Sequence, residues 1–147
     1  MVGWYIVSRD HDARARRSEI RELLKITREL LTKTEKDAFN YWTSAGKPDE
    51  SRILAFDIKQ NLNRLSHAAN VLNRHSENFR VLDVMKQYRQ AVTGGSFEGA
   101  SRAALNRGDE RLMDIAATAV EFDGRLELGF EAIYCSRGLR AIFRLTP

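Results

Sequence analysis

Two prolines are the only obligatory helix breakers in this chain of 147 residues, and one of them, Pro147, is the last residue. The other, Pro48, divides the sequence into two long windows in which no residue forces a helix to end. Apolar residues recur in both windows at intervals of three and four, which is the spacing of an amphipathic α-helix. The chain is therefore predicted to be all-α.

Four helical segments are expected from this periodicity. The first covers about residues 12–43, the second about 48–75 and the third about 77–92. Pro48 with two acids after it is typical of a helix start. The last long helix is predicted to begin at Asp109, because an aspartate there can cap the first turn.

The connection before the last helix, residues 93–108, contains four of the nine glycines and has no clear period. It is predicted to be a loop, with room for a short turn of helix over residues 100–105. Gly124 and Gly129 lie inside the last helix, where each weakens it by about 1 kcal/mol relative to alanine. Such glycines are typical either of a close approach by another helix or of a kink.

The expected architecture is an irregular antiparallel four-helix bundle that forms a single domain over residues 1–147. An apolar N-terminal segment, residues 1–9, precedes the bundle, and a short tail follows Gly138. In an up-down-up-down bundle, the start of the first helix and the end of the last lie at the same pole. Some apolar residues fall off the main stripes, and they suit either a broader core or an interface: Ile26, Phe39, Trp42, Phe56 and Val84.

The surplus positive charge lies at the two ends of the chain. Residues 1–25 hold six Lys/Arg against four Asp/Glu, and residues 132–147 hold three arginines and no acid, whereas the rest is nearly balanced. Both ends also carry large apolar side chains, so the bundle is predicted to place Trp4 beside Phe143 in one basic surface. The candidate docking residues are Trp4, Tyr5, Arg9, Arg14, Arg16, Arg17, Arg137, Arg140, Phe143 and Arg144.

The motifs of common enzymes are missing from the sequence. No glutamate stands three residues before any histidine, as a di-metal bundle requires, and Ala100 stands where a phosphate loop needs lysine. Cys135 is the single cysteine and cannot form an internal disulfide. We therefore expect a non-enzymatic protein, with no catalytic, cofactor-binding or metal-ligating residues.

Acidic residues gather on the last helix. Glu121, Asp123, Glu127 and Glu131 are expected to form a solvated face, the alternative being a site for a cation or a basic partner. This alternative stays open at the level of the sequence.

The predicted function is that of a helical binding module that contacts another protein or a second copy of itself. We expect it in the cytoplasm, where its basic ends suit an anionic surface at the inner membrane. The opening WYIVSRD…RRSEIRELL resembles the segment after a single span in small bacterial membrane proteins, which implies a span upstream of Met1. Nucleic-acid binding through the arginine-rich ends is the alternative, disfavoured because acids dilute the arginines.

Overall fold

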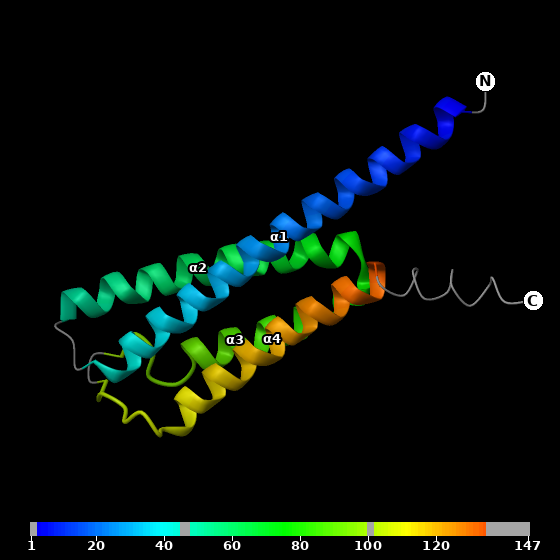
Figure 1. Ribbon diagram of the computed structural model, residues 1–147. Coiled ribbons are helices and arrows are strands. Elements are labelled where there is room, and N and C mark those ends of the chain that lie inside the picture. The colour runs from blue at the N-terminus through cyan, green and yellow to red at the C-terminus, as the bar shows by residue number, and fades with distance from the viewer. Residues whose placement is uncertain (1–2, 45–47, 100–101, 135–147) are drawn as a thin grey trace, which may run out of the picture.

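The computed structural model describes the backbone of residues 3–44, 48–99 and 102–134, and the side chains of those from residue 12 onward except Pro48. Within these ranges the chain forms helices and contains no strand (Figure 1). The elements are α1 (Gly3–Thr43), α2 (Pro48–His75), the 3₁₀ turn η1 (Glu77–Phe79), α3 (Leu82–Thr93) and α4 (Glu110–Tyr134). The predicted all-α fold is confirmed.

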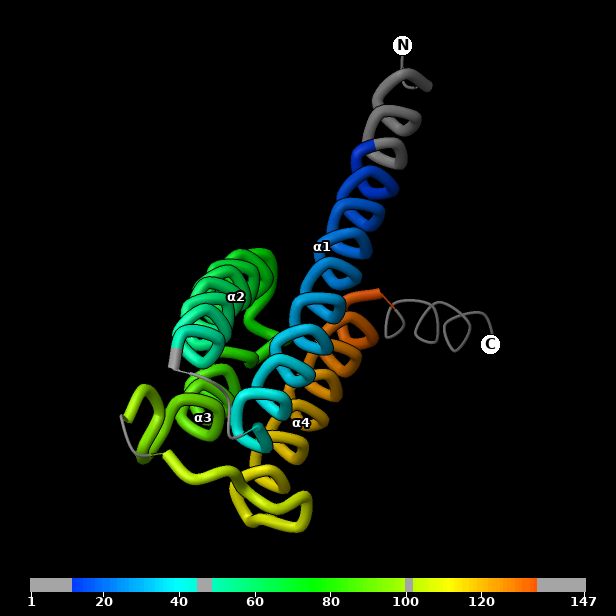
Figure 2. The backbone as a smooth tube through the Cα atoms, turned by 90° about the vertical axis from the view of Figure 1, so that its left-hand side faces the viewer, coloured from blue at the N-terminus to red at the C-terminus, as the bar shows by residue number. Residues whose placement is uncertain are grey.

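The four helices form an antiparallel bundle. Helix α1 lies against α2 and α4, and α3 lies against the same two helices, so the four form a closed ring of neighbours (Figure 2). The bundle is irregular because α3 has 12 residues whereas α2 has 28. Consequently α3 spans only part of the bundle, and η1 completes the packing against α4 and α2.

The core consists of the apolar stripes that the sequence predicts. Its largest fully buried side chains are Trp42, Tyr41, Tyr88, Phe79, Phe122, Ile58, Leu62, Leu65, Leu72, Leu112, Ile115 and Leu126. Burying an aliphatic or aromatic side chain of this size contributes roughly 1.5–3 kcal/mol. Thr27 and Thr34 are also buried, and their hydroxyls donate to the carbonyls of Leu23 and Leu30 at 2.7 Å, which satisfies both groups.

The off-stripe apolar residues divide between core and surface. Trp42 and Val84 are buried and Phe39 is half-buried, so these three belong to a broader core. Ile26 and Phe56 are exposed. The sequence could not separate the two groups because their burial depends on which neighbouring helix covers each flank of a stripe.

Helix α1 begins earlier than predicted, at Gly3 rather than near residue 12. The prediction followed the apolar stripe, whose first buried member is Ile20. Residues can be added to a helix that is already formed without the cost of a new nucleus. Residues 3–19 contain no proline, and they continue α1.

The predicted third helix is wrong in one respect, because it is broken near its start. Arg80 adopts the left-handed conformation, with φ of 45°, and separates η1 from α3. The Ser76 hydroxyl accepts a hydrogen bond from the Asn78 amide at 3.2 Å and caps η1. The break turns Phe79 onto α4, where it is fully buried.

The start of α4 agrees with the prediction. The helix begins at Glu110, and the Asp109 carboxylate accepts a hydrogen bond from the Arg111 amide at 3.0 Å. Asp109 thus satisfies one of the amides that a helix start leaves free.

The loop before α4 folds over the C-terminal end of α1, and we call its described residues, 94–99 and 102–109, the collar. The Leu105 amide donates to the Trp42 carbonyl at 2.8 Å. The expected turn of helix is absent from Arg102–Leu105, since this amide bonds to α1 instead of a local carbonyl; residues 100–101 lie outside the described part. The Trp42 indole donates to the Val92 carbonyl at 3.0 Å, which joins the end of α3 to the C-terminal end of α1.

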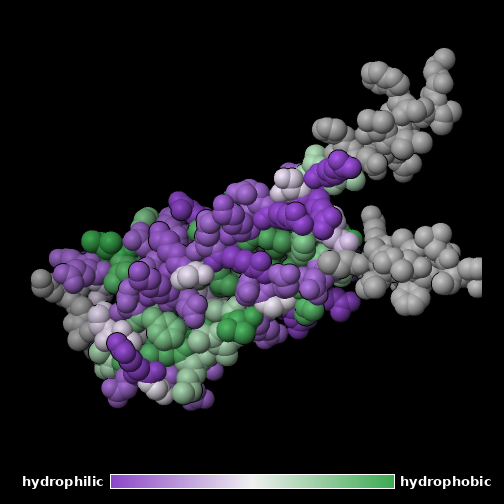
Figure 3. Space-filling view, viewed as in Figure 1, coloured by the Kyte–Doolittle hydropathy of each residue, from purple (hydrophilic) through white to green (hydrophobic). Residues whose placement is uncertain are grey.

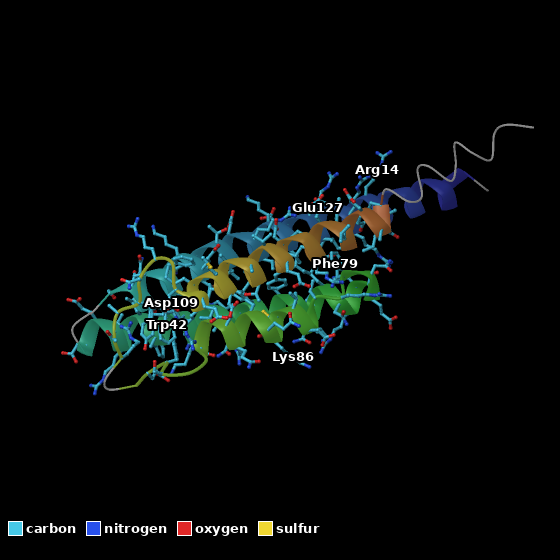
Figure 4. All side chains as sticks on the ribbon, turned by 90° about the horizontal axis from the view of Figure 1, so that it is seen from below. Arg14, Trp42, Phe79, Lys86, Asp109 and Glu127 are labelled. Atoms are coloured by element: carbon cyan, nitrogen blue, oxygen red, sulfur yellow. The ribbon has the colours of Figure 1, made fainter. Side chains whose placement is uncertain are left out.

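Two arginines hold the collar against aromatic side chains. The guanidinium of Arg102 lies 4.1 Å from the Tyr41 ring centroid, and that of Arg111 lies 4.5 Å from the Trp42 ring. Arg111 also donates to the Gly94 carbonyl at 2.7 Å. Such contacts contribute on the order of 1 kcal/mol each, so these arginines have structural roles at the pole opposite Arg14 (Figure 4).

Candidate interaction surfaces

The first residues of α1 form a projecting helix, and we call residues 3–19 the arm. Every side chain of residues 12–19 is exposed, on all faces of the helix. Figure 1 shows the arm extending beyond the ends of the other helices. The side chains of residues 12–19 are therefore accessible from outside and are not part of the core.

The base of the arm rests on the end of α4. The Arg17 guanidinium lies 5.1 Å from the Tyr134 ring centroid, and that of Arg21 lies 5.6 Å from the Phe130 ring. A groove of about 530 Å³ lies at the same junction, bordered by Arg16 and by His75 at the end of α2. The start of α1 and the end of α4 thus meet at one pole, as the antiparallel topology predicts.

The ten predicted docking residues fall into three groups. Three of them are exposed on the arm: Arg14, Arg16 and Arg17. Three others lie in α1, but their side chains are outside the described part: Trp4, Tyr5 and Arg9. Four lie beyond the described residues: Arg137, Arg140, Phe143 and Arg144. The juxtaposition of Trp4 and Phe143 accordingly stays a prediction.

The charges of the described arm are arranged on two faces. Arg14, Arg17 and Arg21 follow one another at i, i+3 and i+7, so they share a face of the helix. Asp12, Arg16 and Glu19 stand at i, i+4 and i+7 on the opposite side, which therefore carries charges of both signs. The arginine face is the one that rests on α4 at Arg17, and it runs past the end of α4 at Arg14.

The outer face of α4 carries a second exposed feature, which sequence reasoning missed. Met113, Val120 and Leu128 are 62%, 73% and 62% exposed, although they are large and apolar. Exposed Ala117 and Gly124 lie between them at helical spacing, and a Cβ on Gly124 would meet no atom of the described part of the chain within 4 Å, apart from its own helical turns. We call these five residues the ridge. In Figure 3, hydrophobic residues lie among hydrophilic ones over the α4 side of the visible face.

Helical spacing in α4 provided a signal for the ridge. With about 100° between successive residues, its members lie roughly opposite the buried line of Ile115, Phe122 and Leu126. The sequence analysis followed only the larger apolar stripe of this helix. A second stripe on the same helix, made of Met113, Ala117, Val120 and Leu128, was the signal in the sequence for this exposed apolar face.

Carboxylates flank the ridge. Six acids, against Arg111 and Arg125, lie along α4: Glu110, Asp114, Glu121, Asp123, Glu127 and Glu131. Arg111 is turned toward Trp42, and Arg125 pairs with Glu121 at 3.3 Å. The outer face of α4 is therefore apolar at its centre and negative at its edges.

One pair of these acids already has a basic partner within the chain. Arg28 of α1 contacts Asp123 at 2.6 Å and Glu127 at 2.5 Å. Its hydrogen bonds to Glu127 and, to a lesser extent, Asp123 raise the pKa of Arg28 despite partial desolvation. All three side chains are substantially exposed, so the contribution to stability is small, and the contact mainly sets the position of α1 along α4.

Two further features concern only the part of the chain that the structure describes, namely metal ligands and membrane-spanning helices. Within it, no three histidine, cysteine or carboxylate side chains gather as metal ligands would. His67 and His75 are exposed on α2. None of the helices there combines the length and apolar character of a membrane span.

The arm and the ridge are thus two exposed features of the described residues, and Ile53 and Phe56 form a further exposed apolar pair on α2. Comparison with known proteins adds no relative to this picture: no family model, no curated protein and no solved structure matches the chain.

Proposed function

We propose that this protein is a helical binding module that docks on another protein through its N-terminal arm. The supporting observation is the exposure of all eight side chains of residues 12–19 on a helix that continues directly into the core. Apart from the contact of Arg17 with Tyr134 at its base, the described arm adds little to the burial that stabilises the bundle. Its exposed arginines are therefore available to a partner.

A protein partner suits the mixed charge of the arm. Arg14 and Arg17 share one face of the described arm, whereas Arg16 shares the opposite side with Asp12 and Glu19, so the arm presents charges of both signs. A partner that contacts more than one face requires charges of both signs, as protein surfaces commonly provide.

An anionic membrane surface and nucleic acid are the two alternatives. Both present negative charge alone, and both would attract the arginines and repel Asp12 and Glu19. The membrane alternative gains from the apolar residues Trp4 and Tyr5 near the start of the sequence, since aromatic side chains favour the lipid interface.

Site-specific photo-crosslinking in cells tests the proposal. A photoreactive residue replaces Ala15, which is exposed on the arm, and in a matched control it replaces Lys86, which is exposed on α3. We expect a covalent adduct with a protein from position 15 only, and we expect Arg14→Glu with Arg17→Glu to abolish it. Equal adducts from both positions, or adducts with lipid or nucleic acid alone, would contradict a protein-docking arm.

A further inference from the structure

We infer that the groove at the base of the arm is a docking site for residues 135–147 of this same chain, which we call the tail. The tail lies outside the described residues, and its apolar side chains are the groups that would enter the groove. Docking of the tail is independent of the proposed function, because the groove borders Ala13 and Arg16, on the side of α1 that faces away from Arg14.

The groove has apolar walls from two helices. The apolar side chains that line it, from α1 and from the last turn of α4, are Ala13, Ile20, Ile133 and Tyr134. Asp12 and Arg16 also line it, and their opposite charges stand one helical turn apart, so charge alone selects no occupant. The volume of about 530 Å³ lies in the range of pockets that bind small organic molecules. The groove therefore admits apolar side chains of a peptide segment.

The tail carries the side chains that such a groove accepts. Four of its seven residues from 139 to 145 are large and apolar: Leu139, Ile142, Phe143 and Leu145. The first three stand at i, i+3 and i+4, so on a helix they share one face, and the three arginines of the tail fall on another side. Burial of such a face is favourable by about 25 cal/mol per Å² of apolar surface. The tail thus has an apolar face suited to packing against the bundle.

Covalent connection favours the tail over a separate molecule. Tyr134 lines the groove and is the last residue of α4, so the tail starts at the rim of the groove. A segment joined by a short connection has an effective concentration on the order of millimolar at its site. A separate molecule must exceed that concentration, or bind more tightly, to displace it. The tail is therefore the occupant that the position of the groove favours.

The length of the tail also suits the groove. Gly138 follows four residues after Tyr134, and glycine readily takes the left-handed conformation that turns a chain at the end of a helix. The next seven residues, 139–145, measure about 10 Å as a helix and about 23 Å when fully extended. The part of α1 that lines the groove, residues 12–20, is about 12 Å long. The tail therefore covers most or all of the groove in either conformation.

A docked tail would give the base of the arm a second contact. Among the described residues, Arg17 on Tyr134 is the contact that supports the arm on α4. A helix that projects from its bundle is only marginally stable in water, because most helical stability comes from packing. Ala13 and Arg16 would gain a packed neighbour on the groove side. The tail is therefore expected to stabilise the arm as a helix.

Paramagnetic relaxation in the full chain tests the inference. Cys135→Ser removes the single native thiol, and Thr146→Cys provides a site for a nitroxide label near the end of the tail. The NMR methyl signals of Ala13 and Ile20 report on the groove from α1, far from the tail in sequence. We expect the label to broaden both signals, and to leave that of Ile53, an exposed residue near the start of α2, unchanged.

Two matched variants separate docking from tethering alone. A labelled chain with Leu139→Ser and Phe143→Ser keeps the length and charge of the tail, and we expect broadening at Ile20 to be at least about twofold weaker in it. Ala13→Arg fills the groove side of α1 and adds a charge of the tail's own sign, so it should weaken the broadening as well. Ser18→Arg places the same side chain on the other side of the arm and should leave the broadening unchanged.

Three results would overturn the inference. Equal broadening in the parent chain and the double-serine chain would show that the tail is tethered near the groove without binding it. Stronger broadening at Val120 or Leu128 would place the tail on the ridge instead. Broadening that arises only between a spin-labelled chain and a separate isotope-labelled chain would place it on a second copy. Thermal unfolding of each variant verifies that the bundle itself is unchanged.

Discussion

Phe79 lies directly against Gly129, so closely that a Cβ on Gly129 would meet the Phe79 Cα at 2.7 Å. The contact brings η1 onto α4 and buries the Phe79 ring completely. Among the described residues outside its own helical turns, no atom lies within 4 Å of the position that a Cβ on Gly124, in the same helix, would take. The two glycines of α4 therefore have opposite roles in the monomer.

This difference predicts opposite effects of alanine. Gly129→Ala should lower the free energy of unfolding by about 1–3 kcal/mol, because the methyl group forces η1 away from α4. Gly124→Ala should raise it by up to about 1 kcal/mol, because alanine favours the helix and meets nothing. Urea unfolding at low protein concentration, where association is negligible, measures both. Changes of the same sign would contradict the described packing of η1.

Tyr88 provides a second matched comparison. Its hydroxyl is buried and has no hydrogen-bond partner among the residues that the structure describes. Burial raises its pKa far above 10.0, with Glu35 and Asp37 adding to the rise, so it stays neutral. Tyr88→Phe should therefore leave stability unchanged or raise it by up to about 1 kcal/mol, since it removes an unsatisfied polar group.

Tyr41→Phe is the control for that substitution. The Tyr41 hydroxyl accepts a hydrogen bond from the Glu98 amide at 2.9 Å, and its loss should cost about 0.5–1.5 kcal/mol. The midpoint of urea unfolding should therefore be lower for Tyr41→Phe than for Tyr88→Phe. A loss of stability in Tyr88→Phe as large as that in Tyr41→Phe would indicate that the Tyr88 hydroxyl has a partner.

Arg111 is predicted to need its planar guanidinium. Arg111→Lys keeps the charge but loses both the stacking on Trp42 and the fork that donates to the Gly94 carbonyl, at a cost of about 1–2 kcal/mol. Arg107→Lys, at an exposed collar position, should have no measurable effect. Hydrogen exchange of the Leu105 amide reports on the collar directly and should accelerate in Arg111→Lys only.

Glu35 makes one part of stability depend on pH. Partial burial raises its pKa above 4.5, so the folded state holds this proton more tightly than the unfolded state does. The penalty for ionising it is absent below pH 4.5 and develops as pH rises through the folded pKa. Glu35→Gln should therefore stabilise the protein at neutral pH, by a few tenths of a kcal/mol because solvent screens the group.

The same variant should show no advantage once Glu35 is protonated in both states. Unfolding midpoints of the parent chain and Glu35→Gln, measured in parallel from pH 3 to 7, should converge at the acid end. A constant difference across this range would show that the effect is not electrostatic.

Periodicity predicted the bundle well because burial of one stripe per helix decides where the helices lie. The C-terminal end of α1, both ends of α2 and the N-cap at Asp109 depend on nearby residues, and all of them could be predicted from the sequence. The break at Arg80 could not, because it depends on Phe79 finding space over Gly129 in a helix 50 residues later. Likewise, Trp42 is buried by a collar that is distant in sequence.

The candidate surfaces were predicted less completely. The excess of arginine at the N-terminus correctly marked exposed residues, since Arg14, Arg16 and Arg17 are all exposed. The ridge was missed because the sequence analysis assigned one apolar stripe to each helix. A second apolar stripe on the opposite side of a helix, separated from the first by carboxylates, indicates an exposed apolar face that the core does not cover.

The arm and the packed part of α1 are one uninterrupted helix. This continuity fixes the angular position of the arginines around the helix axis relative to the bundle. One residue inserted between Glu19 and Ile20 would rotate Arg14 by about 100° around the helix axis, although composition and charge barely change. Four inserted residues would return Arg14 close to its original angular position and move it about one helical turn farther from the bundle. The orientation of the arm's side chains around the helix axis is therefore determined by the packing of the rest of α1 in the bundle.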